Sequence, residues 1–226
     1  KKDDIEFWKS LVINYNKRTL EFAAGTGRLA LPLIREGCLY SGVEISTQYV
    51  EYAHKEKNLS SIIQGDMRKI DLKQTFDYIF IGFNSFAHLL NSSDALSFLD
   101  VVKRHMHTKA HFYIELFMPH PSFLYRKKNE KKKIMDFFDS TTQENVTIEE
   151  NLRYDDESDI ISVIWHYIKP NKTTYQKFKF QMRAYYPDTM NRLLIDSGFH
   201  IQNLWGGYDK KPLNENSNLQ IYECIL

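Results

Sequence analysis

The sequence predicts an α/β fold with a Rossmann-like, seven-stranded, mostly parallel sheet flanked by helices. Two observations predict this fold. Short apolar runs alternate with amphipathic runs through the first half of the chain, which is the pattern of successive β-α-β units. A glycine-rich turn follows the first apolar run, as it does after the first strand of many such sheets. We expect residues 1–226 to form a single domain, with residues 118–184 as an antiparallel β insertion after the fifth strand.

The elements of the first half follow from hydrophobic spacing. Apolar residues at Leu96, Leu99 and Val102 repeat at helical intervals, whereas the β-like runs are short and rich in aliphatic and aromatic residues. In order, we expect a strand at 18–23, a helix at 27–36, a strand at 38–45, a helix at 47–55, strands at 61–64 and 76–83, a helix at 93–106 and a strand at 110–117.

The pattern changes after residue 117. Polar, turn-like segments separate three β-like stretches there, which predicts an antiparallel meander. Pro187 suits the first turn of a later helix, and Gly198 suits its end. The expected strands of this half are 146–154, 160–168, 174–183, 200–205 and 219–225.

The composition argues against several classes of protein. Lys and Arg number 30 against 29 Asp and Glu, so the chain carries no general attraction for nucleic acid or for a membrane surface. No apolar run approaches the roughly 20 residues that a transmembrane helix needs. Cys38 and Cys224 lie in apolar runs, which is typical of reduced core thiols. We therefore expect a cytoplasmic protein.

The densest basic run covers residues 126–133. We interpret it as a solvated helix face or loop, because the charge of the remaining chain is balanced. An RNA-modifying enzyme that uses this run is a weaker alternative, and strongly salt-dependent RNA binding would be its mark. Nucleic acid is therefore not the expected partner.

The glycine turn carries the strongest functional signal. Gly25 and Gly27 permit backbone angles closed to other residues, and the helix beyond them presents free N–H groups. Such a turn also fits a dinucleotide fingerprint. Glu21 favours a different ligand, because a carboxylate before the turn would repel a diphosphate and attract a cationic amino-acid group.

Polar residues also follow the next strands. Glu44 ends the second strand, where an acid can bind both hydroxyls of a ribose. After the third strand, Asp66 can bond an adenine amino group while Met67 packs on the ring, although Asp66 can equally cap the next turn. Phe83 and Asn84 end the fourth strand. Because the carboxyl ends of parallel strands share one edge, we expect these residues to meet there.

In this order and at these spacings, the motifs resemble the class I S-adenosylmethionine-dependent methyltransferases over about residues 18–117. The resemblance implies S-adenosylmethionine as the cofactor, with its methionine portion at the glycine turn, its ribose at Glu44 and its sulfonium near Phe83. The family usually has glycine where this chain has Ala23, which predicts a tighter turn and weaker cofactor binding. The implied cofactor-binding residues are Glu21, Ala23, Gly25, Gly27, Arg28, Glu44, Ile45, Asp66, Met67, Phe83 and Asn84.

The segments 183–187, 193–199 and 206–209 resemble small-molecule members of the family, in which the antiparallel insertion covers the active site as a lid. The resemblance implies in-line methyl transfer to a nitrogen or oxygen of a small molecule, without a metal, by a monomer or a homodimer. A general base is needed only if the acceptor must lose a proton. The main candidates are His88, His120 and Tyr185, and Glu115 and Tyr186 are secondary candidates.

Two other functions remain open at this point. A nicotinamide-dependent oxidoreductase would use the same glycine turn, but Glu21 and Asp66 argue against it, and an NADH binding assay would decide. A non-catalytic cofactor-binding protein on the same scaffold is compatible with Ala23, and it would bind the cofactor without turnover.

Overall fold

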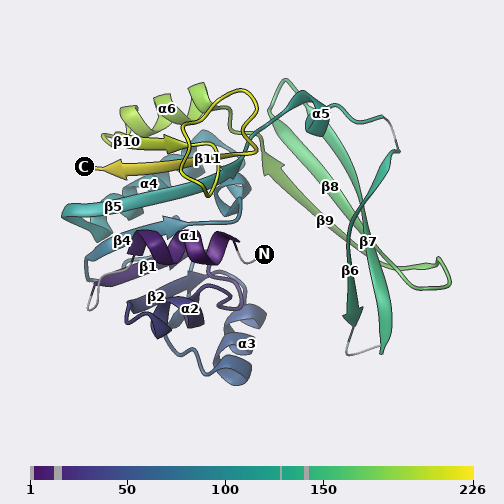
Figure 1. The fold of residues 1–226 in the computed structure, drawn as a ribbon, viewed down its shortest axis with the longest axis horizontal. Coiled ribbons are helices and arrows are strands. Elements are labelled where there is room, and N and C mark those ends of the chain that lie inside the picture. Colours follow the sequence, from purple (N-terminus) through teal and green to yellow (C-terminus); the bar gives the residue numbers. More distant parts are fainter. Residues whose placement is uncertain (1–2, 13–16, 128, 140–142) are drawn as a thin grey trace. The chain divides into compact units, whose positions relative to one another are not determined.

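The structure is a computed structural model that describes residues 3–12, 17–127, 129–139 and 143–226 (Figure 1). Lys128, which belongs to the basic run, lies outside the described residues. The chain divides into two compact units. The first unit comprises Lys1–Phe86, Asn91–Met118 and Tyr186–Leu226, and the second comprises Ala87–Leu90 and Pro119–Tyr185.

The first unit contains the predicted seven-stranded sheet, in the order β10-β11-β5-β4-β1-β2-β3 (Figure 1). All neighbouring strands are parallel except β11, which runs antiparallel to both β10 and β5. The predicted fold class is therefore confirmed. The strands are β1 (Arg18–Phe22), β2 (Leu39–Glu44), β3 (Ile62–Gln64), β4 (Phe76–Ile81), β5 (Met106–Phe117), β10 (His200–Trp205) and β11 (Leu219–Ile225).

Helices pack against this sheet and bury aromatic side chains. Phe98 meets Phe22 with ring centroids 5.0 Å apart, and Trp8 stacks on Phe80 at 4.5 Å. Pro187 stands in the first turn of its helix, and Gly198 follows the end with a φ of +87°, both as predicted. The helical elements are α1 (Asp3–Val12), α2 (Ala30–Arg35), α3 (Thr47–Lys57), η1 (Ser85–His88), α4 (Ser92–His105) and α6 (Pro187–Asp196).

Two features of this unit differ from the expectation. Helix α1 is not predicted from the sequence, although the buried Phe7, Trp8 and Val12 repeat at helical spacing. Helix α2 begins at Ala30 rather than at residue 27, because the glycine turn continues to residue 29. The cysteines behave as predicted, since Cys38 and Cys224 are both buried and unpaired.

The second unit is an antiparallel sheet in the order β6-β7-β8-β9, with the short helix α5 (Pro121–Leu124). Three of these strands are predicted and β6 is not. The interpretation of the basic run as a helix face or loop is wrong for residues 131–133, which begin β6 and pair with β7. Their ammonium groups still reach solvent, because β6 is an edge strand. The strands are β6 (Lys131–Asp139), β7 (Glu144–Asp155), β8 (Ile160–Ile168) and β9 (Thr174–Arg183).

Among the described residues, no helix is long and apolar enough to cross a membrane.

Candidate functional site

The predicted motifs meet at one edge of the first unit's sheet. Strand β1 runs into the glycine turn, and β2, its parallel neighbour, ends at Glu44. The Gly25 N–H donates to Glu44 Oε2 at 2.8 Å, and the Ala24 N–H donates to the Val43 carbonyl at 3.0 Å. The turn and the end of β2 therefore form one hydrogen-bonded unit, as the spacing of the motifs predicts.

The two glycines of the turn serve different purposes. At Gly27, an added Cβ would lie 2.4 Å from Leu59 Cδ1 and 2.9 Å from Ile62 Cδ1, so both side-chain ends would have to move, and the φ of +74° itself favours glycine. At Gly25, with a φ of +56°, an added Cβ would meet nothing within 4 Å. The turn is thus packed on one side and leaves room for close approach to its backbone at Gly25.

Ala23, which departs from the family pattern, lies in the left-handed region with a φ of +56°. A residue with a Cβ pays roughly 1 kcal/mol or more for this conformation. The turn nevertheless closes, because the Gly27 N–H donates to the Ala24 carbonyl at 2.9 Å. The consequence of alanine at this position is backbone strain in a turn that is otherwise intact.

Glu44 is held at the end of β2 by two backbone donors. Its side chain is buried, with Oε2 accepting from Gly25 and Oε1 accepting from the Ser46 N–H at 2.8 Å. Each carboxylate oxygen has two lone pairs, so each keeps one acceptor position after these bonds are made. Ile45, the next residue, is 63% exposed and presents an apolar side chain beside this carboxylate.

Glu21 is a buried acid whose ionisation differs from that of an exposed one. Burial raises its pKa to about 8, against the opposing effects of a hydrogen bond from the Tyr40 hydroxyl and of the Arg28 charge. Near pH 7 its carboxyl group is therefore largely protonated. A cationic group placed beside it would lower this pKa and favour the carboxylate.

Asp66 has the opposite electrostatic setting. The Arg68 side chain donates to both of its oxygens, at 2.9 Å from Nε and 2.8 Å from Nη2, and lowers the pKa of Asp66 to about 2. Arg68 Nη1 also pairs with Asp94 at 3.0 Å. Asp66 further accepts from the Arg68 N–H at 2.9 Å, so it caps the turn after β3, which is the role that the sequence left open beside adenine binding. Met67 is half-buried in this turn.

The turn after β4 lies beside the glycine turn. Phe83 and Asn84 both have positive φ angles, +53° and +61°, and the Asn84 Oδ1 atom is buried without a hydrogen-bond partner among the described residues. The Arg28 guanidinium lies 5.4 Å from the centre of the Phe83 ring. Phe83 is 54% exposed, so it is available to a ligand at this edge.

Asp4 and Tyr208 also reach this edge. The sequence gives no role to Asp4, and it includes Tyr208 only within the segment 206–209 that resembles the family. Asp4, fully buried at the start of α1, binds Arg28 Nη2 at 2.6 Å. The Tyr208 hydroxyl donates to Glu115 Oε1 at 2.6 Å, while Glu115 Oε2 accepts the Phe83 N–H at 3.1 Å. The helical spacing of α1 was a visible signal, but its contact with residue 28 was not.

The catalytic candidates His88, His120 and Tyr185 all belong to the second unit. A ring nitrogen of His88 lies 3.2 Å from the Gln181 carbonyl oxygen. The Tyr185 hydroxyl is buried and donates to the Leu89 carbonyl, and His120 is the N-cap of α5. Their catalytic roles stay predictions.

A family model described as a methyltransferase domain matches residues 19–109. This span contains the glycine turn, Glu44 and the turn after β4, which are the features that meet at the sheet edge. The match supports the resemblance of this part of the chain to the class I S-adenosylmethionine-dependent methyltransferases. No curated protein sequence matches the chain significantly.

Solved methyltransferase structures share the fold of this one. The CcbJ methyltransferase from Streptomyces caelestis aligns with a TM-score of 0.82 at 17% identity, covering 99% of this chain and 88% of that one. The sugar N-methyltransferase KedS8 from a Streptoalloteichus species gives 0.72 at 15% identity, with coverages of 96% and 83%. The glycopeptide N-methyltransferase MtfA, solved with S-adenosylmethionine, gives 0.65 at 18% identity, with coverages of 99% and 93%. At these identities the likeness establishes the fold alone.

The strain at Ala23 is testable by substitution. Ala23→Gly should raise the free energy of unfolding by about 1 kcal/mol, because glycine adopts a φ of +56° without a Cβ penalty. Denaturant unfolding measures this change. The matched control is Ala24→Gly, which should lower stability because Ala24 is buried and has no positive φ. Equal destabilisation by both substitutions would show that Ala23 is not strained.

The raised pKa of Glu21 predicts a pH-dependent stability. Between its ordinary pKa near 4.5 and its folded value of about 8, the folded state binds more protons than the unfolded state, so this group makes stability fall as pH rises. In Glu21→Gln, the difference in unfolding free energy between pH 5 and pH 8.5 should be smaller than in the unsubstituted protein. The exposed Glu51→Gln should leave that difference unchanged. Identical pH profiles for all three proteins would rule out a raised Glu21 pKa.

Proposed function

We propose that this protein methylates a nitrogen atom of a small-molecule amine with S-adenosylmethionine as methyl donor. The observation that carries the cofactor part is the bond between the Gly25 N–H and the Glu44 carboxylate, which joins a glycine turn to a ribose-binding acid. The family match over residues 19–109 supports the same cofactor.

The residues present fit the parts of this cofactor. Glu44 keeps an acceptor position on each oxygen for a ribose hydroxyl, and the open space at Gly25 admits the methionine portion. Glu21 would accept a hydrogen bond from the cofactor's ammonium group. Arg28, whose side chain is 43% exposed, would pair with its carboxylate. Ile45 and Met67 would flank the adenine, with Asp66 near its amino group.

The chemistry needs little from the protein beyond placement. When bound, S-adenosylmethionine supplies an electrophilic methyl group on its sulfonium. The chain's own residues orient the two molecules and exclude water from the edge of the sheet. The Asp4 and Phe83 contacts hold Arg28 in place, so the cofactor's carboxylate would meet a preoriented guanidinium.

The proposal of nitrogen as the methyl acceptor draws on the neighbouring structures. Two of the proteins with this fold are described as sugar and glycopeptide N-methyltransferases. A neutral amine attacks through its own lone pair, so a base is needed only to remove the proton afterwards. We retain His88 and His120 as candidates for that step. Tyr185 is the weakest of the three, because its hydroxyl already donates a hydrogen bond to the Leu89 carbonyl.

Three further expectations stay proposals. Residues 118–184 act as a lid, the protein is a monomer or a homodimer, and it works in the cytoplasm. The unpaired, buried thiols of Cys38 and Cys224 support a reducing compartment.

Glu44→Gln tests the proposed function. The amide nitrogen cannot accept the bonds that a carboxylate oxygen accepts, so the affinity for S-adenosylmethionine should fall by about tenfold or more. Calorimetric titration measures the affinity, and circular dichroism checks the fold. The control is Glu56→Gln, an exposed glutamate of α3 that should bind normally.

The acceptor is tested with matched amino and hydroxyl sugars, by following the demethylated cofactor as product. We expect turnover of the amino sugar alone. Turnover of the hydroxyl sugar alone would contradict nitrogen transfer, and failure of the folded protein to bind S-adenosylmethionine would overturn the whole proposal.

A further inference from the structure

The turn after β4 has a strained backbone. Phe83 and Asn84 are successive residues with positive φ angles, +53° and +61°. Asparagine tolerates this region, whereas phenylalanine rarely adopts it, and such a conformation persists only where the surrounding structure holds it. The Ser85 N–H donates to the Gly82 carbonyl at 3.1 Å, but this bond lies within the turn. The position of the turn on the sheet therefore depends on contacts with other segments.

Glu115 supplies one such contact. Strands β4 and β5 are parallel neighbours whose register pairs Ile81 with Ile114, so Glu115 comes level with the start of the turn. Glu115 is only 2% exposed, and its Oε2 atom accepts a hydrogen bond from the Phe83 N–H at 3.1 Å. The bond thus holds the residue of the turn whose φ angle is the less favourable one.

Tyr208 holds the other oxygen of this carboxylate. Its hydroxyl donates to Glu115 Oε1 at 2.6 Å. Burial first, and then the charge of Glu115, raise the pKa of Tyr208 above its usual range, so the hydroxyl keeps its proton and acts as a donor rather than as a base. With a donor on each oxygen, Glu115 is better suited to holding the turn than to taking a proton from the methyl acceptor.

Tyr208 is itself anchored in the chain that follows β10. The Gly206 N–H donates to the Lys211 carbonyl at 2.8 Å, which closes the turn that contains Tyr208. The Tyr208 ring packs against Phe7 of α1, with ring centroids 5.3 Å apart. An anchored segment therefore presents the hydroxyl to Glu115.

The turn after β4 determines where the Phe83 ring lies. Phe83 is 54% exposed, and the Arg28 guanidinium lies 5.4 Å from the centre of its ring. In the proposed function Arg28 pairs with the carboxylate of S-adenosylmethionine. A short carbon chain separates that carboxylate from the sulfonium, so a cofactor bound at Arg28 would bring its sulfonium toward Phe83. The face of an aromatic ring attracts a cation, so the position of this ring matters more for the charged cofactor than for its neutral demethylated product.

We propose that Tyr208 is a positioning residue, which acts through Glu115 to fix the turn that holds the Phe83 ring beside the sulfonium of the cofactor. This inference rests on the proposed binding of S-adenosylmethionine. Tyr208 makes no contact with the reacting atoms in this role, because its hydroxyl already donates a hydrogen bond to Glu115.

Tyr208→Phe removes only the hydroxyl, and calorimetric titration with S-adenosylmethionine and S-adenosylhomocysteine measures the effect. The second ligand lacks the sulfonium charge, so a displaced Phe83 ring changes the ratio of the two dissociation constants. We expect the affinity for S-adenosylmethionine to fall by about fivefold relative to that for S-adenosylhomocysteine. A loss of stability alone would weaken the binding of both ligands equally.

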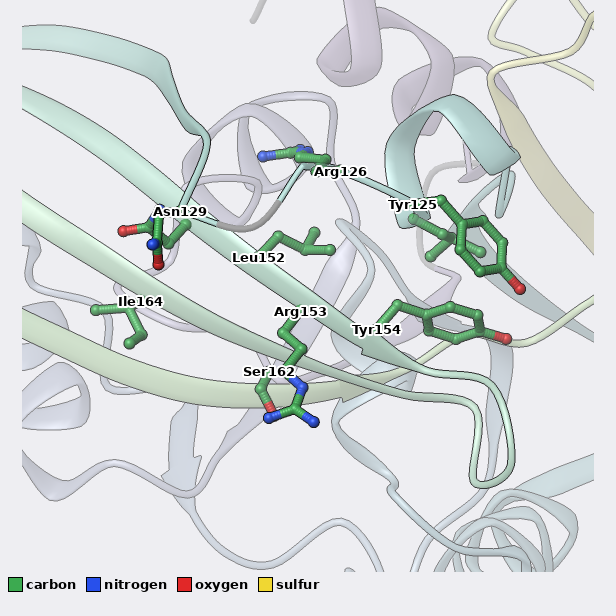
Figure 2. A pocket seen from close by; sticks show the side chains of 10 residues that line it. Tyr125, Arg126, Asn129, Leu152, Arg153, Tyr154, Ser162 and Ile164 are labelled. Carbon is green, nitrogen blue, oxygen red and sulfur yellow. The ribbon is translucent and has the colours of Figure 1, made fainter.

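Two other tyrosines provide controls. Tyr113→Phe is the matched one, because the Tyr113 hydroxyl also donates to a buried glutamate of the same sheet, Glu223, at 2.9 Å. Tyr154→Phe is a control from the second unit, where Figure 2 shows the Tyr154 ring and where its hydroxyl donates to Asp159 Oδ1 at 2.8 Å. Neither control should change the ratio of the dissociation constants by more than about twofold.

Glu115→Gln tests the same connection with a side chain of similar shape. Its amide nitrogen cannot accept one of the two bonds, so the ratio should shift about as far as in Tyr208→Phe, and the double variant should show no further shift. A ratio that changes no more in Tyr208→Phe than in Tyr113→Phe, or additive shifts in the double variant, would overturn the inference while leaving the proposed function intact. If the folded, unsubstituted protein binds neither ligand, the proposed function fails and this inference fails with it.

Discussion

The hydrogen bond from the Gly25 N–H to the Glu44 carboxylate is the contact on which the site depends. It joins residues 19 positions apart, and it forms only because β1 and β2 are parallel neighbours whose register pairs Phe22 with Val43. That register brings the turn after β1 level with the end of β2. The left-handed backbone at Gly25 then directs its N–H toward the carboxylate, while the other carboxylate oxygen is held by Ser46. The pairing of β1 with β2 and the two backbone donors therefore fix the position of the Glu44 carboxylate at the edge of the sheet.

The surroundings of each acid at this edge, more than its residue type, determine the direction in which its pKa shifts. Glu21 is surrounded by protein and its pKa rises to about 8, whereas Asp66 is paired with Arg68 and its pKa falls to about 2. As an anion, Glu21 would repel a diphosphate, but burial raises its pKa, so this repulsion is weakened at neutral pH. The choice between cofactors therefore depends on the family match and on Glu44 more than on the charge of Glu21.

The sheet and the glycine turn are predictable because they depend on local sequence patterns. These patterns are the alternation of strand-like and helix-like apolar runs and the fixed spacing of the glycines. The sequence marks Ala23 only as a departure from the family pattern, whereas its left-handed backbone is a finding of the structure. Strand β6 is not predictable, because its lysine-rich sequence acquires strand structure by pairing with β7. The contact of Asp4 with Arg28 also cannot be predicted from the sequence, since it joins two segments that are distant along the chain.

The most direct measurement of the central claim is a titration of the ¹⁵N-labelled protein with S-adenosylhomocysteine, followed through the backbone amides that hold Glu44. If the ribose binds this carboxylate, the Gly25 and Ser46 signals should shift together and saturate with one dissociation constant, and NADH should move neither. If S-adenosylhomocysteine binds while both amides stay unperturbed, or if NADH shifts them instead, then the cofactor site is not the one described.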